Sequence, residues 1–380
     1  MSGKTSPQGP IRVAIAGLGR IGWGHHAQEV MKRPEFKLVA VIDPDPNRLA
    51  EARKKAPEVR AYTDWEKFLK EPGDAELAVV ATATTMHTPM TIEALRAGLN
   101  VLCEKPMAMN VKDADRMIAA AKKARRVLTI HQNWRTLAHQ HHLISIMGSG
   151  ILGRVFLMKL SVHQFRRRND WQCFRRLGGG ALNNHGAHQI DTALLVLQSP
   201  VVSVWGDLQR NVCPGDAEDH FKVVLRGKNG RVVDVEYASA CAFPQPRWLV
   251  LGSLGTLVEQ DGEFVIKYLD PAKLKKLKAD PRPVPFGFGY GVYGGETLEF
   301  QEKRVKADAP EFAVDFYGKL VEALRHGKKP WVTPESVREQ IRVLALARKG
   351  TGFELWTAER ITAENEGRSP SRPRRVCPVR

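Results

Sequence analysis

The segment from Gly178 to Asp191, GGGALNNHGAHQID, opens with three glycines and then places two asparagines and two histidines ahead of an aspartate. If Asn183 caps a helix, Asn184, His188 and Asp191 fall at i, i+4 and i+7 and form one polar stripe. An imidazole near a helix N-terminus is biased towards its neutral form, which suits His188 to be a general base that Asp191 could orient. A buried histidine that its neighbours satisfy is the alternative interpretation.

A glycine-rich turn near the start of the chain indicates a dinucleotide site. Gly17, Gly19 and Gly22 form a GxGxxG motif between the apolar segment IRVAIA and a helical pattern. Without side chains, the backbone amides can approach a pyrophosphate, and the helix N-terminus stabilises its charge. Asp43 ends the next apolar segment, about twenty residues on, where a carboxylate can bind both ribose hydroxyls. Because this carboxylate repels a 2′-phosphate, NAD is predicted in preference to NADP, although Arg48 lies nearby.

A lysine follows another apolar segment. Glu104, Lys105 and Pro106 come directly after NVLC, so Lys105 is expected at the carboxyl edge of a parallel sheet, where such folds bind ligands. Its amine could donate to a substrate oxygen or shuttle a proton. A solvated surface charge is the alternative interpretation.

Two further clusters give weaker signals. His139, His141 and His142 lack a nearby carboxylate and are expected on a solvated helix face, so no metal is predicted. The run 166–168 of three arginines is interpreted as solvated surface. If these arginines face the pocket instead, they indicate an anionic substrate such as a sugar acid, a sulfonate or a nucleotide sugar. Trp171 could stack on a sugar ring.

The segments that must position these residues change pattern along the chain. Strand patterns (IRVAIA, FKLVAVIDPD, AELAVVATAT, NVLCEKP, VLTIHQNW) alternate with helix patterns (TPMTIEALRAGL, VKDADRMIAAAKKARR), which predicts a parallel sheet with helices on both faces. From about Arg154 longer strands follow one another (RVFLMKLSVHQF, VVSVWGDLQR, HFKVVLRGKNGRVVDVEYAS, RWLVLGSLGTLVEQ), which predicts an antiparallel sheet. Two helices follow, the second with Thr333 as N-cap and Pro334 at its first position. Residues 262–306 fit neither pattern and are expected to be an insertion or an oligomer arm.

The composition is that of a globular protein. A chain of 380 residues can form two domains, each with its own core. No apolar run is long enough for a bilayer, and the polar start MSGKTSPQGP has no signal-peptide pattern, so no membrane contact and a cytoplasmic location are expected. Five cysteines without a CxxC pair predict free thiols.

The formal charge of +17 raises the question of a polyanionic partner. No helix-turn-helix, zinc-finger or RRM pattern accompanies it, and part of it lies in the terminal segment GRSPSRPRRVCPVR, whose composition favours disorder. Nucleic-acid binding is therefore not expected.

These motifs together resemble one family. GxGxxG, Asp43, the TATTMH loop ending at His87, EKP, QNWR, GSGILG and GGGALNNHGAHQID occur in the order found in the Gfo/Idh/MocA family, from about Ile11 to Gly350. The resemblance implies oxidation or reduction of a sugar, inositol or glycoside hydroxyl with a tightly held nicotinamide cofactor. The implied fold class is α/β, with a Rossmann doubly wound parallel sheet and an α+β domain whose large, open, mostly antiparallel sheet makes homodimer or homotetramer contacts.

The expected boundaries are 10–132 for the dinucleotide-binding domain and 133–360 for the substrate and oligomerisation domain, with disordered tails at 1–9 and 361–380. The motifs and the resemblance give three sets of candidate site residues. The catalytic set is Lys105, Asn184 and His188. The cofactor-binding set is Gly17, Gly19, Arg20, Ile21, Gly22, Asp43, Thr82, His87, Glu104, Lys105 and Asn133. The substrate set is Lys105, Arg135, Trp171, Asn184, His185 and His188.

The chain departs from the family pattern at one chemically important position. The EKP lysine and an Asp-x-x-x-His pair act at the reacting carbon in that pattern, and the aspartate of the pair is Asn184 here. An amide can hold a hydroxyl group but cannot take its proton. His188 and Lys105 are therefore expected to share the acid–base work, with His188 accepting the hydroxyl proton and Lys105 steadying the developing alkoxide.

Three functions follow, in order of preference. The first is an NAD-dependent dehydrogenase of a sugar, polyol or glycoside. The second is a redox-assisted glycosidase that oxidises C3 transiently, in which His185 would have a role, since NHG resembles the THG of that branch. The third is a non-catalytic NAD-binding regulator. Accumulation of NADH or release of an aglycone would separate them.

Overall fold

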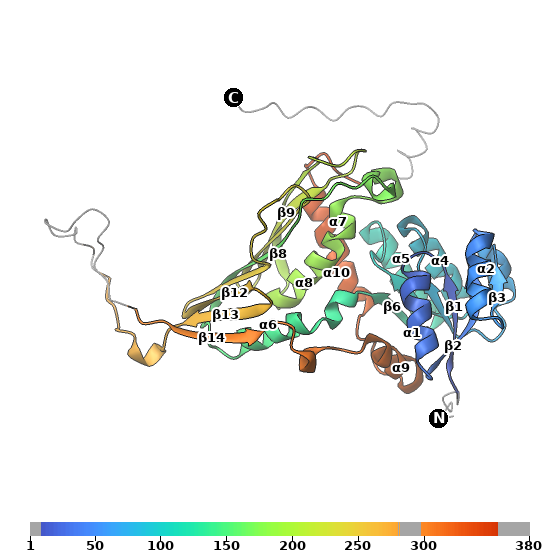
Figure 1. Ribbon diagram of the computed structural model, residues 1–380, viewed down its shortest axis with the longest axis horizontal. Helices are drawn as coiled ribbons and strands as arrows, with labels where there is room; N and C mark the ends of the chain where they lie inside the picture. Colours follow the sequence, from blue (N-terminus) through green and yellow to red (C-terminus); the bar gives the residue numbers. More distant parts are fainter. Residues whose placement is uncertain (1–8, 280, 282–297, 356–380) are drawn as a thin grey trace.

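The computed structural model of the chain describes residues 9–279, 281 and 298–355. These residues form two parts, each built around its own sheet and its own apolar core (Figure 1). Apart from Gly9, the tails predicted at 1–9 and 361–380 lie outside the described residues. None of the helices in the described ranges is both long and apolar enough to cross a bilayer.

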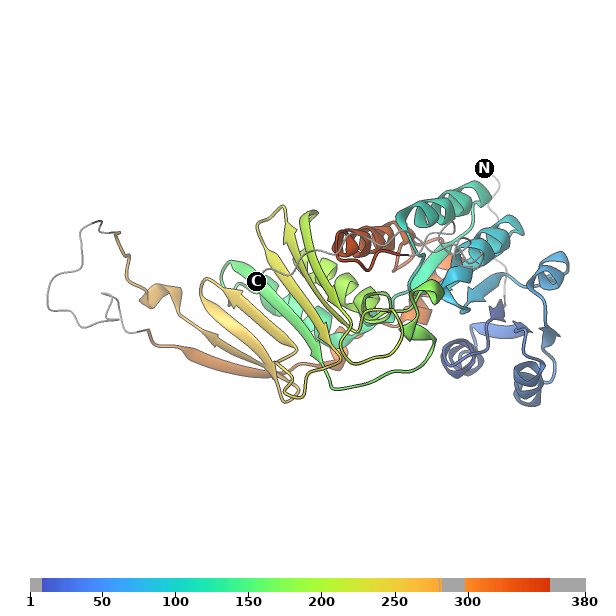
Figure 2. The ribbon, with the colours of Figure 1, turned by 90° about the horizontal axis from the view of Figure 1, so that it is seen from above.

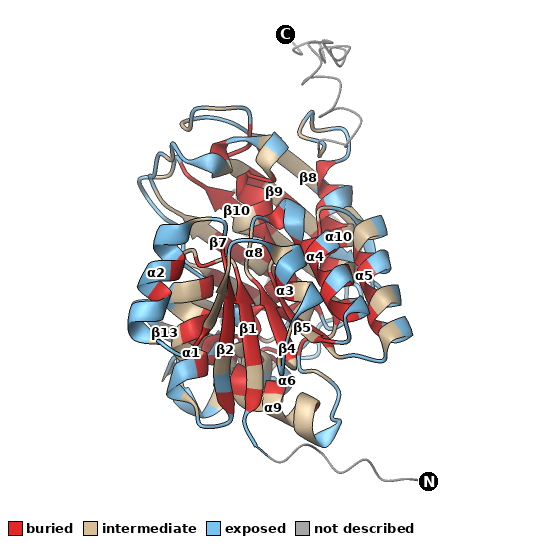
Figure 3. Ribbon diagram, turned by 90° about the vertical axis from the view of Figure 1, so that its right-hand side faces the viewer, coloured by how far each residue is buried: buried red, intermediate tan, exposed pale blue. Residues whose placement is uncertain are grey.

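The first part is a sheet of six parallel strands in the order β3-β2-β1-β4-β5-β6. The strands are β1 (Ile11–Ala16), β2 (Phe36–Ile42), β3 (Arg60–Tyr62), β4 (Leu77–Val80), β5 (Asn100–Glu104) and β6 (Leu128–His131). The helices are α1 (Gln28–Lys32), α2 (Pro46–Lys55), α3 (Trp65–Lys70), α4 (Thr84–Arg96) and α5 (Val111–Ala124). The middle strands are buried between these helices (Figure 3). This order is that of a doubly wound dinucleotide-binding sheet, so the predicted parallel domain is confirmed.

The first part differs from the sequence prediction in its short elements. The patterns do not predict α2, β3 or α3, because these elements are short and mostly polar on the surface. Helix α4 begins at Thr84, so the loop expected to end at His87 is the first turn of that helix. Residues Gly22–Ala27 form a π-helical turn, in which the amides of His25 and His26 both donate to the Ile21 carbonyl, at 3.0 and 2.9 Å. Such turns are rare and often occur at functional sites.

The second part is a sheet of eight strands in the order β14-β13-β12-β11-β7-β10-β9-β8. The strands are β7 (Val155–His163), β8 (Val201–Gln209), β9 (His220–Gly227), β10 (Val232–Ala238), β11 (Trp248–Gly252), β12 (Gly255–Gln260), β13 (Glu263–Tyr268) and β14 (Gln301–Lys306). Only β7 and β10 pair in parallel among them. The predicted large, mostly antiparallel sheet is therefore confirmed.

One face of this sheet is apolar and covered. A row of directly paired residues on that face is buried: Leu225, Val233, Met158, Val250, Leu257 and Ile266. Helices lie on this face, on the side of the first part (Figures 1 and 2). They are α6 (Ala138–Gly148), α7 (Ala181–Asn184), α8 (Gly186–Leu197) and α10 (Pro334–Arg348). Helix α10 begins as predicted, because the side chain of Thr333 accepts from the Ser336 amide at 3.3 Å and Pro334 is the first residue.

The segment 262–306 proves to contain two strands of the second sheet. Glu263 pairs with Lys306, and Tyr268 with Gln301, so β13 and β14 form a hairpin at the edge of the sheet. Residues 280 and 282–297 between them lie outside the described residues. The sequence pattern does not reveal β14, since QEKRVK is an edge strand with charged side chains rather than an apolar alternation.

The chain returns to the first part after it completes the second sheet. Helix α9 (Phe316–His326) packs Phe316, Tyr317 and Leu320 into the core of the first part. The domain boundaries at 10–132 and 133–360 remain a prediction. Helix α9 belongs to the second range by sequence but packs against the first part.

Candidate active site

A cleft of about 510 Å³ lies where the two parts meet, at the carboxyl ends of the first sheet's strands. Most predicted site residues line it: Arg20, Ile21, Thr82, His87, Glu104, Lys105, Asn133, Trp171, Asn184, His185 and His188. Gly17, Gly19, Gly22 and Asp43 are not among its lining residues, and they surround the turn from which Arg20 and Ile21 enter it. Arg135 does not line the cleft.

The glycine turn has room for a cofactor on one side only. A Cβ on Gly22 would lie 1.7 Å from the Gly17 carbonyl oxygen, and one on Gly17 would lie 2.5 Å from the Ala81 carbonyl oxygen. These two glycines therefore allow close backbone packing. A Cβ on Gly19 would meet nothing within 4 Å, so the space beside Gly19 is open. The turn fits a pyrophosphate lying against bare backbone.

Asp43 fixes this turn against the sheet. Its carboxylate is buried and accepts from the Leu18 amide at 2.7 Å and from the Asp45 amide at 2.9 Å. Arg48 Nη1 lies 3.4 Å from Asp43 Oδ2. Each carboxylate oxygen has a second lone pair, so the expected contact with a ribose remains chemically open.

His87 connects the start of α4 to the EKP segment. Its Nδ1 lies 2.8 Å from the Pro106 carbonyl oxygen and its Nε2 lies 3.2 Å from the Thr82 carbonyl oxygen. Burial lowers the pKa of His87. A neutral imidazole carries one N–H and can donate to only one of these two carbonyl oxygens, and the shorter contact is the one to Pro106 of the EKP segment.

Lys105 and Asn184 meet across the cleft from the two parts. Lys105 Nζ donates to the Asn184 backbone carbonyl at 3.2 Å and to Asn184 Oδ1 at 3.3 Å. Burial lowers the pKa of Lys105, and the nearby charges of Arg20 and Arg168 lower it further. The amine therefore sits in the wall of the cleft with neutral oxygens as its partners.

His188 is held in the cleft by an aromatic contact. Its ring stacks on Trp134, with centroids 4.8 Å apart and an angle of 15° between the rings. Burial holds the pKa of His188 well below its usual value, and the charge of Lys105 lowers it further. Its Nδ1 is buried without a hydrogen-bond partner among the described residues. A neutral imidazole beside an amine is a suitable proton acceptor.

The predicted role of Asp191 as orienter of His188 is wrong, and so is the placement of Arg135 at the substrate. Asp191 is bound by Arg135, whose Nε donates to Oδ2 at 2.7 Å and whose Nη2 donates to Oδ1 at 2.5 Å. Both side chains are buried, and Arg135 Nη1 donates to Ser336 Oγ at 2.7 Å. This ion pair ties the turn after β6 to α8 and α10, and Trp134 enters the cleft in place of Arg135.

Replacing Arg135 with methionine is expected to destabilise the fold by about 3–5 kcal/mol, because it leaves the Asp191 carboxylate buried without its counterion. Urea unfolding followed by circular dichroism measures this. Arg116→Met is the matched control, since Arg116 pairs with Asp113 on the exposed face of α5, and a change within about 1 kcal/mol is expected there. Equal losses in both variants would contradict the structural role of the Arg135–Asp191 pair.

The expectation that Asn183 caps a helix is wrong. Helix α7 begins at Ala181 after Gly180, and the side chain of Asn183 points back to the glycine loop. Its Nδ2 donates to the carbonyl oxygens of Gly178 and Gly179 at 2.9 and 3.1 Å, and its Oδ1 accepts from Arg348. Asn183 therefore fixes the glycine loop, which lines the cleft beside Asn184.

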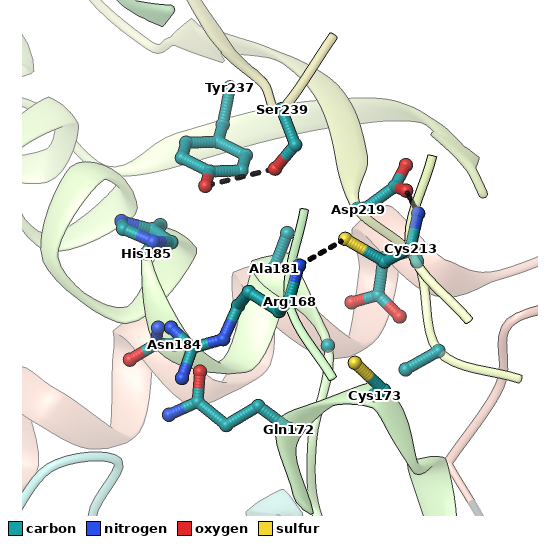
Figure 4. A pocket seen from close by; sticks show the side chains of 13 residues that line it. Arg168, Gln172, Cys173, Ala181, Asn184, His185, Cys213, Asp219, Tyr237 and Ser239 are labelled. Atoms are coloured by element: carbon teal, nitrogen blue, oxygen red, sulfur yellow. Dashed lines mark hydrogen bonds between the residues drawn. The ribbon is translucent and has the colours of Figure 1, made fainter. Parts of the chain in front are cut away.

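His185 faces a small pocket that adjoins the cleft (Figure 4). Its ring stacks on Tyr237 with centroids 4.2 Å apart. Burial, together with the charges of Lys105, Arg168 and Arg166, lowers the pKa of His185 to about 4. His185 is therefore a neutral side chain with several cations around it.

A buried histidine network supports Glu104, and the sequence patterns do not reveal it. Glu104 Oε1 accepts from His26 Nε2 at 3.0 Å and from His131 Nδ1 at 2.6 Å. His26 Nδ1 in turn lies 2.7 Å from the Tyr317 hydroxyl, and His25 Nε2 lies 3.4 Å from His131 Nε2. Burial raises the pKa of Glu104, but the hydrogen bonds from His131 and His26 outweigh it and hold this pKa well below its usual value. The network keeps Glu104 ionised and fixed directly before Lys105.

The ring nitrogens of His25, His26 and His131 that lie close together could be considered metal ligands, but hydrogen bonds already occupy them. Ligand atoms of His25, His26 and His131 lie within 4.8 Å of one another. Both nitrogens of His26 and both of His131 have the partners just described. The absence of a metal remains a prediction. The expected solvated face at 139–142 is wrong for His139, which is buried, whereas His142 stacks on Phe312 at 4.7 Å.

Two of the three arginines at 166–168 line the cleft, and the run also stays in contact with solvent, since Arg166 and Arg167 are exposed and Arg168 is half-buried. Arg166 and Arg168 follow β7 and face the side of Asn184 and His185, whereas Arg167 lies outside the cleft and donates to the Val212 carbonyl oxygen at 3.2 Å. In an extended segment successive side chains point to opposite sides, so Arg167 points away from the cleft that Arg166 and Arg168 line.

Comparison with known proteins gives two family matches. The model described as "Oxidoreductase family, NAD-binding Rossmann fold" matches residues 11–132. The model of the GFO/IDH/MocA C-terminal domain matches residues 141–258. Together these matches span more than half of the chain.

Individual relatives are more distant. The 1-carboxy-3-chloro-3,4-dihydroxycyclohexa-1,5-diene dehydrogenase of Comamonas testosteroni is 30% identical over 275 residues, 70% of this chain and 66% of the relative. The myo-inositol 2-dehydrogenase of Thermotoga maritima is 27% identical over 65% of this chain and 74% of its own length. The WlbA dehydrogenase of Bordetella pertussis, solved with NADH and UDP-GlcNAcA, superposes with a TM-score of 0.68 and 22% identity over 90% of this chain and 96% of WlbA. At that identity, this last similarity shows the fold.

Proposed function

We propose a function from the premise that the chain belongs to the GFO/IDH/MocA family of oxidoreductases, because models of that family match both of its parts. It is therefore an NAD-binding oxidoreductase. The proposed reaction oxidises or reduces a ring hydroxyl of a sugar, polyol or glycoside with NAD as the redox partner. The names of the relatives, which describe dehydrogenases of myo-inositol and of a dihydroxycyclohexadiene, support a cyclic alcohol as the substrate.

One observation carries this proposal: Lys105 from the first part, and Asn184 and His188 from the second, line the same cleft, with Lys105 hydrogen-bonded to Asn184. An amine, an amide and a neutral imidazole suffice to hold an alcohol and to remove its proton. The relevant motifs lie far apart in the sequence, and their convergence requires both parts of the fold.

The proton of the alcohol goes to His188 in the proposed mechanism. Its lowered pKa keeps the imidazole neutral and able to accept. Lys105 donates a hydrogen bond to the alcohol oxygen and stabilises the negative charge that grows there as the proton leaves. Asn184 cannot take a proton, so its amide positions Lys105 and the substrate hydroxyl.

The cofactor would be held by the glycine turn and its neighbours. The open side of Gly19 and the start of the π-helical turn suit the pyrophosphate, and Asp43 suits a ribose. Thr82, His87, Glu104 and Asn133 line the wall towards Lys105 and would shape the nicotinamide end. The chemistry that bound NAD supplies is acceptance of a hydride from the substrate carbon.

The test is an absorbance screen for NADH with sugars, inositols and glycosides, combined with analysis of released aglycone. Steady accumulation of NADH is expected. Aglycone release without net NADH would instead identify a redox-assisted glycosidase, in which His185 would act. NAD binding with neither product would identify a regulator.

We also propose a homodimer or homotetramer through the outer face of the second sheet. Among the described residues, no helix covers this face, and its paired row is mixed: Trp205, Val224, Asp234, Lys159 and Leu249, with Trp205 56% exposed. The cytoplasmic location, a role in carbohydrate metabolism and the lack of a nucleic-acid partner remain predictions.

Trp205→Glu is expected to shift the protein towards the monomer, because it replaces a large exposed aromatic side chain of this face with a charge that is costly to bury. Size-exclusion chromatography with light scattering measures the mass. Phe243→Glu is the control, since Phe243 is exposed in the loop before β11 and is not expected to change the mass. An unchanged oligomer in Trp205→Glu would contradict an interface at this face.

A further inference from the structure

The charges around the cleft are unequal. Arg20, Lys105, Arg166 and Arg168 line it, and Glu104 is the carboxylate among its lining residues. Glu104 is buried, and its oxygens accept from His26, His131 and the Lys105 amide. Because these hydrogen bonds occupy Glu104, the cleft offers cationic groups to a ligand from several sides.

Two of the cations belong to the substrate side of the cleft. Arg20 lies in the glycine turn, where the pyrophosphate is expected. Arg166 and Arg168 come from the second part, and Arg168 also lines the adjoining pocket with Asn184 and His185 (Figure 4). The charges of both arginines reach His185, since both lower its pKa.

These arginines are available to a ligand. Arg166 has no hydrogen-bond or ion-pair partner for its guanidinium within the part of the chain that the structure describes. Arg168 forms a two-bond contact with Asp170, which is exposed, so water screens this pair. The Arg168 backbone amide also lies 3.3 Å from Cys213 Sγ, which fixes the segment.

Asn184 is uncharged, and this affects the charge balance of the cleft. A carboxylate in its place would form an ion pair with Lys105, 3.3 Å from the present Oδ1, and would repel an anion. The amide leaves the charge of Lys105 without a counterion across the cleft. A neutral substrate would cover these cations without offering a counterion to Lys105 or Arg166, which is unfavourable.

We propose that the substrate carries an oxyanion, a carboxylate or a phosphate, which binds Arg166 and Arg168 while a ring hydroxyl of the same molecule lies at Lys105 and His188. This inference rests on the proposed function. Guanidinium groups match both anions, because their planar donors form paired hydrogen bonds with two oxygens.

The test compares matched substrates on the enzyme loaded with NAD. Glucuronate and galacturonate are paired with glucose and galactose, and glucose 6-phosphate and galactose 6-phosphate form the phosphate arm. Calorimetry measures binding of each compound, and NADH absorbance measures turnover. The anionic member that fits is expected to bind at least tenfold more tightly than its neutral partner, and the arm in which this occurs identifies the anion.

Substitutions in the arginine run localise the effect. Arg166→Met and Arg168→Met are each expected to weaken binding of the anionic compound about 10- to 100-fold and to leave the neutral compound unchanged. Arg167→Met is the matched control with unchanged binding, since Arg167 lies outside the cleft. Asn184→Asp is expected to weaken the anion more than the neutral compound.

The outcomes separate the inference from the function. Selective binding of an acid that depends on Arg166 or Arg168, without NADH formation, would support the inference and contradict the dehydrogenase proposal. Turnover of neutral sugars without any preference for the anionic partner would support the dehydrogenase and overturn the inference. Absence of tighter binding for every acid in the panel would also overturn it.

Discussion

His188→Ala is expected to lower kcat by about 10²–10⁴-fold while NAD binds as before, because the alcohol loses its proton acceptor and the cofactor side of the cleft is unchanged. Steady-state kinetics measure the loss, and fluorescence titration measures the NAD affinity. The ring also stacks on Trp134, so circular dichroism must show an intact fold.

His326→Ala is the matched control. His326 is exposed at the end of α9, and its loss is expected to leave kcat unchanged. Near-normal turnover in His188→Ala, with the control also normal, would assign the proton transfer to another group, with Lys105 the first to consider.

The pH dependence gives an independent check on the base. The histidine must be neutral to accept a proton, and burial holds the pKa of His188 well below 6.5. The neutral form therefore persists as the pH falls through 6.5, and kcat/KM is expected to stay level there and to decline only at lower pH. A fall centred near pH 6.5 would indicate an ordinary exposed histidine instead.

Lys105→Met is expected to lower kcat by about 10²–10³-fold, since the growing negative charge on the alcohol oxygen loses its cationic donor in a partly buried site. Lys70→Met, an exposed lysine at the end of α3, is the control and is expected to have no effect. Added methylammonium is expected to restore part of the activity of Lys105→Met, which would not occur if Lys105 served only the packing of the cleft.

The alkaline side of the profile tests the same residue. The charged amine is the active form, and burial lowers the pKa of Lys105 from 10.5. Activity is therefore expected to decline on the alkaline side at a lower pH than an ordinary lysine would require. A decline that is the same in wild type and in Lys105→Met would contradict this assignment.

The sequence predicted those parts of the site whose position follows from local structure. Lys105 follows the end of a buried strand, and Asn184 and His188 lie four residues apart on consecutive helical turns. The strand end places Lys105 at the carboxyl edge of the parallel sheet. Helical spacing places Asn184 and His188 on one stripe, and the family resemblance implied that this stripe meets Lys105. The two sheets could also be predicted from local patterns, because strands that alternate with helices give way to successive strands near Arg154.

The parts that were wrong depend on packing between distant segments. Within QNWR, the choice between Trp134 and Arg135 as the residue that enters the cleft is made by the buried Asp191, which binds Arg135. In the run 166–168, alternation separates Arg167 from its two neighbours, but the pattern does not say which side faces the cleft. Arg166 is exposed and also lines the cleft, so a solvated charge run and a place at the pocket are compatible here.

The histidine network could not be predicted at all. His26 and Tyr317 are 291 positions apart, and His131 lies on a strand whose own pattern is apolar. No periodicity links such residues, because the contact exists only after α9 has returned to the first part.

That return has a consequence for how the protein is made. The ribosome synthesises residues 11–132 long before Phe316 and Tyr317. Until α9 is made, the apolar surface of the first part that α9 covers is exposed, and His26 lacks the hydrogen bond to the Tyr317 hydroxyl. Cofactor capture that needs a fixed Glu104 is therefore expected only once translation has passed α9. A truncated fragment ending at residue 132 would keep this apolar surface exposed and would lack the hydrogen bond to His26.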